Sequence, residues 1–170
     1  MALDVSKALK NPGQVYPFQE ALELPEMEVL SDPVRFKAIE VDGEFFCTGD
    51  HRISLRAEIE ATAVSRCSRC LEPVEAPVRA EIDALYAKQP DPEDPDLYSF
   101  EANTLELEDA VRDALLLELP LQFFCKPDCK GLCPVCGVNL NRETCTCQEG
   151  NVTTGPFSAL KSIVLNDEEV

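Results

Sequence analysis

Six of the chain's nine cysteines lie within the 25 residues FFCKPDCKGLCPVCGVNLNRETCTC, from Phe123 to Cys147. The start of the chain, MALDVSKALKNPGQ, lacks the apolar run of a secretory signal. No apolar stretch in the sequence approaches the roughly 20 residues needed to cross a bilayer. We therefore expect a soluble, cytoplasmic protein without a membrane partner. Thiols stay reduced in that compartment, so this spacing predicts a metal site or redox chemistry rather than structural disulfides.

The cysteines fall into pairs at short spacing. Zinc prefers four tetrahedral thiolate or imidazole ligands, and a Cys-x-x-Cys turn supplies two of them. The segment CPVCG also carries the proline and glycine that are typical of tight metal-binding turns. Eight cysteines at this spacing are too many for incidental packing and predict two four-ligand sites, with zinc as the expected ion. The candidate ligands are Cys67, Cys70, Cys125, Cys129, Cys133, Cys136, Cys145 and Cys147.

Loop closure favours one division of these ligands. The last four lie within 15 residues, so they can close a site at little cost in chain entropy. The pair Cys67 and Cys70 would then meet Cys125 and Cys129 and join the C-terminal module to the sheet. A competing arrangement places the two Cys-x-x-Cys turns in one site as a zinc ribbon.

Two other uses of the thiols stay open. A redox protein could use Cys67 and Cys70, although a catalytic Cys-x-x-Cys usually opens a helix, whereas this one is expected between strands. An iron–sulfur cluster is compatible with the ligand count. Cys47 stands apart and is expected to be a core residue, and His51, the single histidine, a surface turn residue. We find no catalytic triad or phosphate loop and predict that the protein is not an enzyme.

Residue patterns predict a sheet followed by a helix. Apolar residues alternate strictly from Ile53 to Ala63 and again from Val74 to Ala84, which predicts a hairpin with the CSRC sequence at its tip. A shift of phase near residue 38 predicts a β-bulge. Asp42-Gly43 predicts a hairpin turn. Short helices are expected over 5–10 and 156–165, an acidic loop over 89–103, and a longer helix that Thr104 caps and Pro120 ends.

The net charge is −17, which disfavours binding to nucleic acid over the whole surface. Ten acidic residues lie between Asp91 and Glu118 against the single Arg112, so a basic ribosomal protein is a suitable partner. A few cations near the cysteines, such as Arg66, Arg69 and Lys130, leave direct contact with RNA possible but not dominant.

Five segments together resemble the YceD family of large ribosomal RNA subunit accumulation proteins. They are CSRCLEPV at 67–74, LELEDAVRDALLLELPL at 105–121, CKPDCKGLCPVCGVNLN at 125–141, CTC at 145–147 and PFSALKSI at 156–163. The resemblance implies a non-enzymatic factor needed for normal levels of large-subunit (23S) ribosomal RNA. It also implies a gene neighbourhood shared with a small basic protein of that subunit.

The sequence thus predicts an α+β protein. Residues 1–122 are expected to form an N-terminal antiparallel β-sheet with the CSRC hairpin, the acidic linker and a helix. Residues 123–170 are expected to form a cysteine-rich zinc module with a C-terminal helix. The predicted function is ribosome biogenesis through binding of a ribosomal protein or precursor RNA. A thiol redox protein and a zinc-ribbon nucleic-acid-binding module remain the alternatives.

Overall fold

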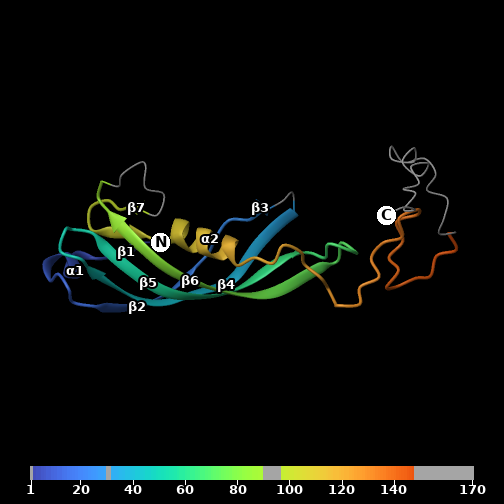
Figure 1. Ribbon diagram of the computed structural model, residues 1–170, viewed down its shortest axis with the longest axis horizontal. Coiled ribbons are helices and arrows are strands. Elements are labelled where there is room, and N and C mark those ends of the chain that lie inside the picture. Colours follow the sequence, from blue (N-terminus) through green and yellow to red (C-terminus); the bar gives the residue numbers. More distant parts are fainter. Residues whose placement is uncertain (1, 30–31, 90–96, 148–170) are drawn as a thin grey trace, which may run out of the picture. The chain divides into compact units, whose positions relative to one another are not determined.

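The computed structural model describes residues 2–29, 32–89 and 97–147 (Figure 1). The chain divides into two compact units, Met1–Cys129 and Lys130–Val170, and each is described by itself below. In its described residues the first unit is mostly β-sheet with two helices. The α+β class and the antiparallel sheet therefore fit in their broad outline. No helix in the described part of the chain is long and apolar enough to cross a membrane.

A twisted sheet forms the body of the first unit. Its strands run in the order β2-β4-β5-β6-β7, and β3 pairs with the start of β4. All pairs are antiparallel except β6 with β7, which is parallel. The strands are β2 (Tyr16–Leu22), β3 (Met27–Val29), β4 (Asp32–Cys47), β5 (Ile53–Arg66), β6 (Pro73–Ala87) and β7 (Leu97–Ser99).

The predicted hairpin of two long strands is confirmed as β5 and β6. Every second residue of β5 is buried and the residues between them are exposed or half-buried, so one face of the strand packs in the core and the other faces water. Among the residues that the structure describes, β6 has no strand partner on its outer side at Pro73 and Pro77, because β7 pairs only with its last residues. This agrees with their expected place on an edge strand. Proline lacks an N–H, and on the unpaired side of such a strand no inter-strand hydrogen bond is lost.

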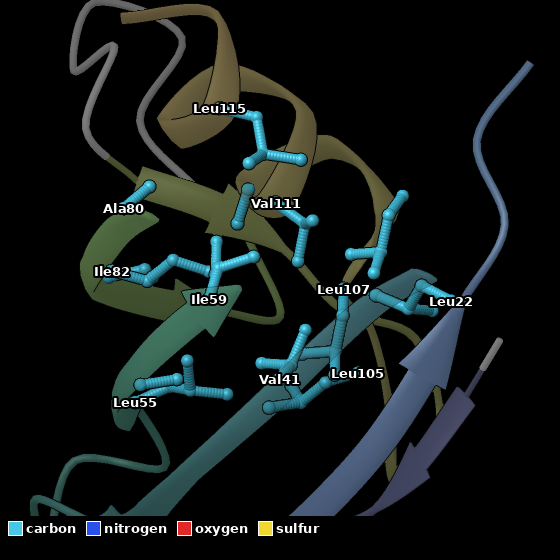
Figure 2. Packing of buried hydrophobic residues seen from close by; sticks show 14 of the residues in the cluster. Leu22, Val41, Leu55, Ile59, Ala80, Ile82, Leu105, Leu107, Val111 and Leu115 are labelled. Atoms are coloured by element: carbon cyan, nitrogen blue, oxygen red, sulfur yellow. The ribbon is translucent and has the colours of Figure 1, made fainter. Parts of the chain in front are cut away.

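The apolar face of the sheet is covered by the helix α2 (Glu108–Leu117) and by a small two-stranded sheet. The latter pairs β1 (Ala2–Asp4) with β8 (Thr104–Glu106), and the helix α1 (Ser6–Lys10) follows β1. Figure 2 shows Val111 and Leu115 of α2 lying over the strands that carry Ile59 and Ala80. Each such buried aliphatic side chain contributes about 2 kcal/mol to stability, so this face is where the core of the unit lies.

The predicted bulge is confirmed. The register of β4 against β5 shifts between Lys37 and Glu40, and Ala38 between them has a φ of +49°. The extra residue lets Ile39 and Val41 continue to face the core after the shift in phase.

The hairpin turn predicted at Asp42-Gly43 is wrong, because both residues lie in the middle of β4. A Cβ at Gly43 would collide with the carbonyl oxygen of Arg56 and lie 2.5 Å from the Cβ of Ala57. The glycine therefore serves the close approach of β5 rather than a turn. The chain reverses at 48–52, where the N–H of Thr48 donates to the carbonyl of Arg52 and His51 has a φ of +55°.

The helix cap predicted at Thr104 is also wrong. Thr104 is the first residue of β8, where it pairs with Asp4. The helix begins at Glu108, and Leu107 precedes it without a side-chain capping bond. Pairing with a distant N-terminal strand thus outweighs the local capping preference of threonine.

The second unit is described over residues 130–147. It has no helix or strand of more than an isolated bridge in that range, and the bridge joins Leu132 to Asn139. The helix predicted over 156–165 and residues 90–96 of the predicted acidic loop lie outside the described residues.

Candidate metal centres

The first cysteine cluster lies at the tip of the β5–β6 hairpin. Cys67 and Cys70 occupy the turn, and Cys125 and Cys129 come from the segment that follows α2. All four sulfur atoms lie within 4.8 Å of one another. The Cys67 and Cys129 Sγ atoms are 3.8 Å apart, and those of Cys70 and Cys125 are 3.6 Å apart.

These sulfur separations fit a tetrahedral zinc site. With Zn–S bonds of about 2.3 Å, the edge of a tetrahedron is about 3.8 Å. A disulfide needs a sulfur–sulfur distance of about 2.05 Å, and all nine cysteines are free thiols. The donor set of four soft thiolates also suits zinc, which makes the cluster a candidate metal centre.

The backbone of the 67–72 turn prepares Cys67 as an anion. The Cys67 N–H donates to the Glu72 carbonyl at 2.7 Å, and the Leu71 N–H donates to the Cys67 carbonyl at 2.9 Å. Burial raises the pKa of the Cys67 thiol. Three peptide N–H groups nevertheless lower this pKa to about 6; they belong to Cys125, Arg69 and Cys70.

The two residues between Cys67 and Cys70 hold the second cysteine pair in place. Ser68 exchanges two hydrogen bonds with the backbone of Phe123, at 2.8 and 3.2 Å. The Arg69 guanidinium donates to the carbonyls of Pro127 and Cys129 at 3.3 and 3.1 Å. It also lies 4.6 Å from the centre of the Phe124 ring. The sequence showed Arg69 only as a surface cation, since carbonyls 58 and 60 residues away carry no sequence signal.

The second cluster is built on the same backbone turn. The Cys133 N–H donates to the Val138 carbonyl at 2.8 Å, and the Gly137 N–H donates to the Cys133 carbonyl at 2.9 Å. The Val135 N–H points at the Cys133 sulfur, 3.5 Å away. The sulfur atoms of Cys133, Cys136, Cys145 and Cys147 all lie within 4.8 Å of one another. This set is therefore a second candidate metal centre.

Two asparagines brace the second cluster, and sequence reasoning missed them. The Asn139 side-chain oxygen accepts from the N–H of Asn141, and the Asn141 side-chain oxygen accepts from the N–H of Lys130. The Asn139 carbonyl accepts from the N–H groups of Arg142 and Glu143. The sequence NLN, directly after CPVCGV, is the available signal, because asparagine side chains often organise turns.

Both clusters favour a bound cation. In the second cluster, peptide N–H groups of Cys136 and Val135 lower the pKa of Cys133 to about 6. Burial and the neighbouring thiols raise the pKa of Cys125 to about 12, and hydrogen bonding to Cys136, followed by burial, raises that of Cys147 to about 12. One thiolate forms readily in each set and opposes ionisation of the others, whereas a divalent ion would stabilise all four.

The structure groups the eight cysteines as the loop-closure argument predicts. The two Cys-x-x-Cys turns belong to different clusters, contrary to the ribbon arrangement. Cys47 is buried in the sheet core, as expected, and His51 lies in the exposed turn at 48–52. The Cys67–Cys70 turn joins two strands rather than opening a helix, so it lacks the helix dipole of a redox Cys-x-x-Cys.

Comparison with known proteins adds a family to this geometry. The family model "Large ribosomal RNA subunit accumulation protein YceD" matches residues 55–164. No solved structure matches the chain significantly.

Relatives occur in bacteria and plants. The chain is 31% identical to the protein YlbN of Bacillus subtilis over 93% of both chains. It is 30% identical to a protein of Mycobacterium tuberculosis over 84% of this chain and 72% of the relative. It is 27% identical to the chloroplastic "Large ribosomal RNA subunit accumulation protein YCED homolog 1" of Zea mays, over 59% of this chain and 46% of the relative. The chain therefore belongs to the YceD family.

Proposed function

We propose that this protein is a non-enzymatic ribosome biogenesis factor that supports accumulation of large-subunit (23S) ribosomal RNA. The observation that carries the proposal is the family match over residues 55–164. The names of the maize and Arabidopsis thaliana relatives support it, since both are called large ribosomal RNA subunit accumulation proteins. The protein acts by binding in the cytoplasm.

Two zinc ions organise the protein in this proposal. Each is held by one cluster of four cysteines, and the sulfur separations of 3.8 and 3.6 Å in the first cluster support this assignment. The zinc ions are structural, because four thiolates fill the tetrahedral shell and leave no open position for a substrate.

A metal role accounts for the Cys67–Cys70 pair better than thiol redox catalysis does. The Cys67 side chain is fully buried, and its low pKa arises from N–H groups that equally stabilise a zinc-bound thiolate. A redox cysteine needs an exposed thiolate that its partner can reach.

The partner in this proposal is a basic protein of the large ribosomal subunit or an assembly intermediate that contains one. The net charge of −17 favours rapid association with such a protein and opposes binding to RNA phosphates. Direct RNA contact is secondary and limited to the cations near the cysteines.

Depletion and rescue in cells test this function. Loss of the gene should lower 23S relative to small-subunit ribosomal RNA, and the wild-type gene should restore the ratio. A variant with Cys70→Ser and Cys136→Ser should fail to restore it, because both zinc sites are damaged. Cys47→Ala is the matched control, since it removes a thiol outside both clusters and should rescue. An unchanged RNA ratio after depletion would refute the proposed function.

A further inference from the structure

The outer face of the main sheet carries an ordered array of charges. On this face β4, β5 and β6 lie side by side, and their register places exposed residues in three parallel rows. The central row is acidic on all three strands, with Asp42, Glu58 and Glu81. The rows on either side are Glu44, Arg56, Asp83 and Glu40, Glu60, Arg79.

The two arginines are already engaged within the outer rows. Arg56 lies 3.3 Å from Asp83, and Arg79 lies 3.1 Å from Glu60. Among the residues that the structure describes, Asp42, Glu58 and Glu81 have no cation partner. Seven acids against two arginines leave this face with a local charge of about −5.

The central row is unfavourable for the isolated protein. Side chains directly opposite each other on neighbouring strands have Cβ atoms about 5 Å apart, and like charges at that distance destabilise a sheet. Sheets normally place opposite charges there, as the pairs Arg56–Asp83 and Arg79–Glu60 do on either side. A bound cationic group would remove the repulsion.

The same face is hollowed rather than flat. One open hollow of about 570 Å³ lies over the backbone of Gly43 and Ala57. A second hollow of about 530 Å³ is lined by Ile59 and Ala80 and also by Glu118, the residue that follows α2. Glu58 and Glu81 line both hollows, so the central acidic row stands between two adjoining depressions.

We infer that this outer sheet face is the docking surface for an extended, lysine- and arginine-rich polypeptide segment. Along β4 the three acids Glu40, Asp42 and Glu44 recur at every second residue, about 6.7 Å apart. An extended polypeptide with a cation at every second residue has the same spacing. Lying along β4, such a segment places one cation at Asp42, which is the member of the central row on that strand and lies opposite Glu58, and the neighbouring cations at Glu40 and Glu44. These cationic side chains can enter the first hollow, which Asp42 and Glu44 line.

This surface differs from the acidic stretch 91–118 that the sequence suggested. In that stretch, Arg112 of α2 forms an ion pair with Asp109 on the same helix, at 2.8 Å, so part of the negative charge there is already neutralised. The inference rests on the proposed function only for the ribosomal origin of the partner. The docking face itself follows from the charges, the strand register and the hollows of the sheet surface.

The test measures binding of a basic peptide to the full-length, zinc-loaded protein. The probe is a fluorescent 12-residue peptide of alternating lysine and serine, followed by fluorescence anisotropy at low salt. The row variant combines Asp42→Asn, Glu58→Gln and Glu81→Gln. The control variant combines Glu23→Gln, Glu26→Gln and Glu28→Gln, which removes the same charge from exposed residues before and in β3.

We expect the row variant to bind the peptide about tenfold more weakly than wild type, and the control variant less than threefold. The row variant should melt at or above the wild-type temperature, because like-charge repulsion is relieved; a lower melting temperature would contradict the argument. Equal weakening in both variants would overturn the inference, as would tighter binding of wild type to poly-uridine RNA than to the peptide. If peptide affinity falls in the row variant but not in the control variant, and gene depletion leaves the RNA ratio unchanged, the docking face is supported and the proposed ribosomal function is refuted.

Discussion

The two cysteine turns, 67–72 and 133–138, share a backbone but serve different segments of chain. In each, the first cysteine donates to a carbonyl five residues ahead and accepts from an N–H four residues ahead. In each, the fifth residue has a positive φ, +62° at Leu71 and +75° at Gly137. The first turn meets cysteines 55 and 62 residues away, whereas the second meets cysteines within the same short loop. One local motif can therefore either join distant parts of a fold or close a loop on itself.

The cysteines of the two clusters also differ in how far they are buried. Cys67, Cys70 and Cys129 of the first cluster are buried, whereas Cys133 alone is buried in the second. The first site is part of the packing between the hairpin tip and the segment after α2, through Ser68 and Arg69. The second depends on its own ligands and on Asn139 and Asn141. Loss of a ligand should therefore destabilise a large part of the first unit at the first site, but only the local loop at the second.

The largest effect is expected from Cys70→Ser compared with Cys136→Ser, since each replaces the second cysteine of its turn. If zinc joins Cys70 to Cys125, 55 residues away, Cys70→Ser opens that link, and loop entropy predicts that the free energy of unfolding of residues 2–129 falls by up to about 4 kcal/mol. Cys136→Ser should change that value by less than about 0.5 kcal/mol. Chemical denaturation followed by the near-ultraviolet signal of the tyrosines measures both.

Hydrogen exchange locates the same effect. Cys70→Ser should expose the amides of Ser68 and Phe123, which bond to each other across the joint. Cys136→Ser should expose those of Cys133, Gly137 and Leu140 only. Loss of protection confined to residues 125–147 in both variants would contradict the claim that the first site joins distant segments while the second closes only its own loop.

A smaller effect should come from the residue with positive φ. Leu71 adopts a conformation that costs a residue with a Cβ about 1 kcal/mol, whereas Gly137 adopts it freely. Gly137→Ala should weaken zinc binding at the second site by about fivefold, from backbone strain alone, because a Cβ there would meet no atom within 4 Å. Leu71→Gly should be close to neutral, since relief of strain offsets the greater freedom of glycine in the unfolded chain.

Competition with a chelator measures both variants. Leu71→Asn serves as the control at the first turn, because asparagine tolerates a positive φ and adds little backbone freedom. Unchanged zinc affinity in Gly137→Ala would show that the positive φ of the second turn carries no cost.

Much of this comparison could be predicted from the sequence, where the signal is local. The alternation in β5, the bulge at residue 38 and the second cysteine cluster follow from spacing along the chain, and the first cluster takes the four clustered cysteines that remain. The errors arose where distant segments decide. The local sequence predicts a turn at Gly43, but in the structure β5 packs closely against this residue. It predicts a helix cap at Thr104, but there β8 pairs with β1.

The acidic row shows the same limit. Asp42, Glu58 and Glu81 are far apart in the sequence, and only the register of three strands brings them into line. The contacts of Arg69 likewise depend on a segment nearly 60 residues away. Spacing predicted which cysteines meet, but not which neighbours hold them.

The most direct test of two separate metal sites is a zinc count by native mass spectrometry on the intact protein and its variants. Two zinc ions should be bound by the wild type and by Cys47→Ala. One should be bound by Cys70→Ser and one by Cys136→Ser, and none by the double variant. A wild-type protein with a single zinc ion, lost in both single variants alike, would contradict the account and favour one ribbon site built from both turns.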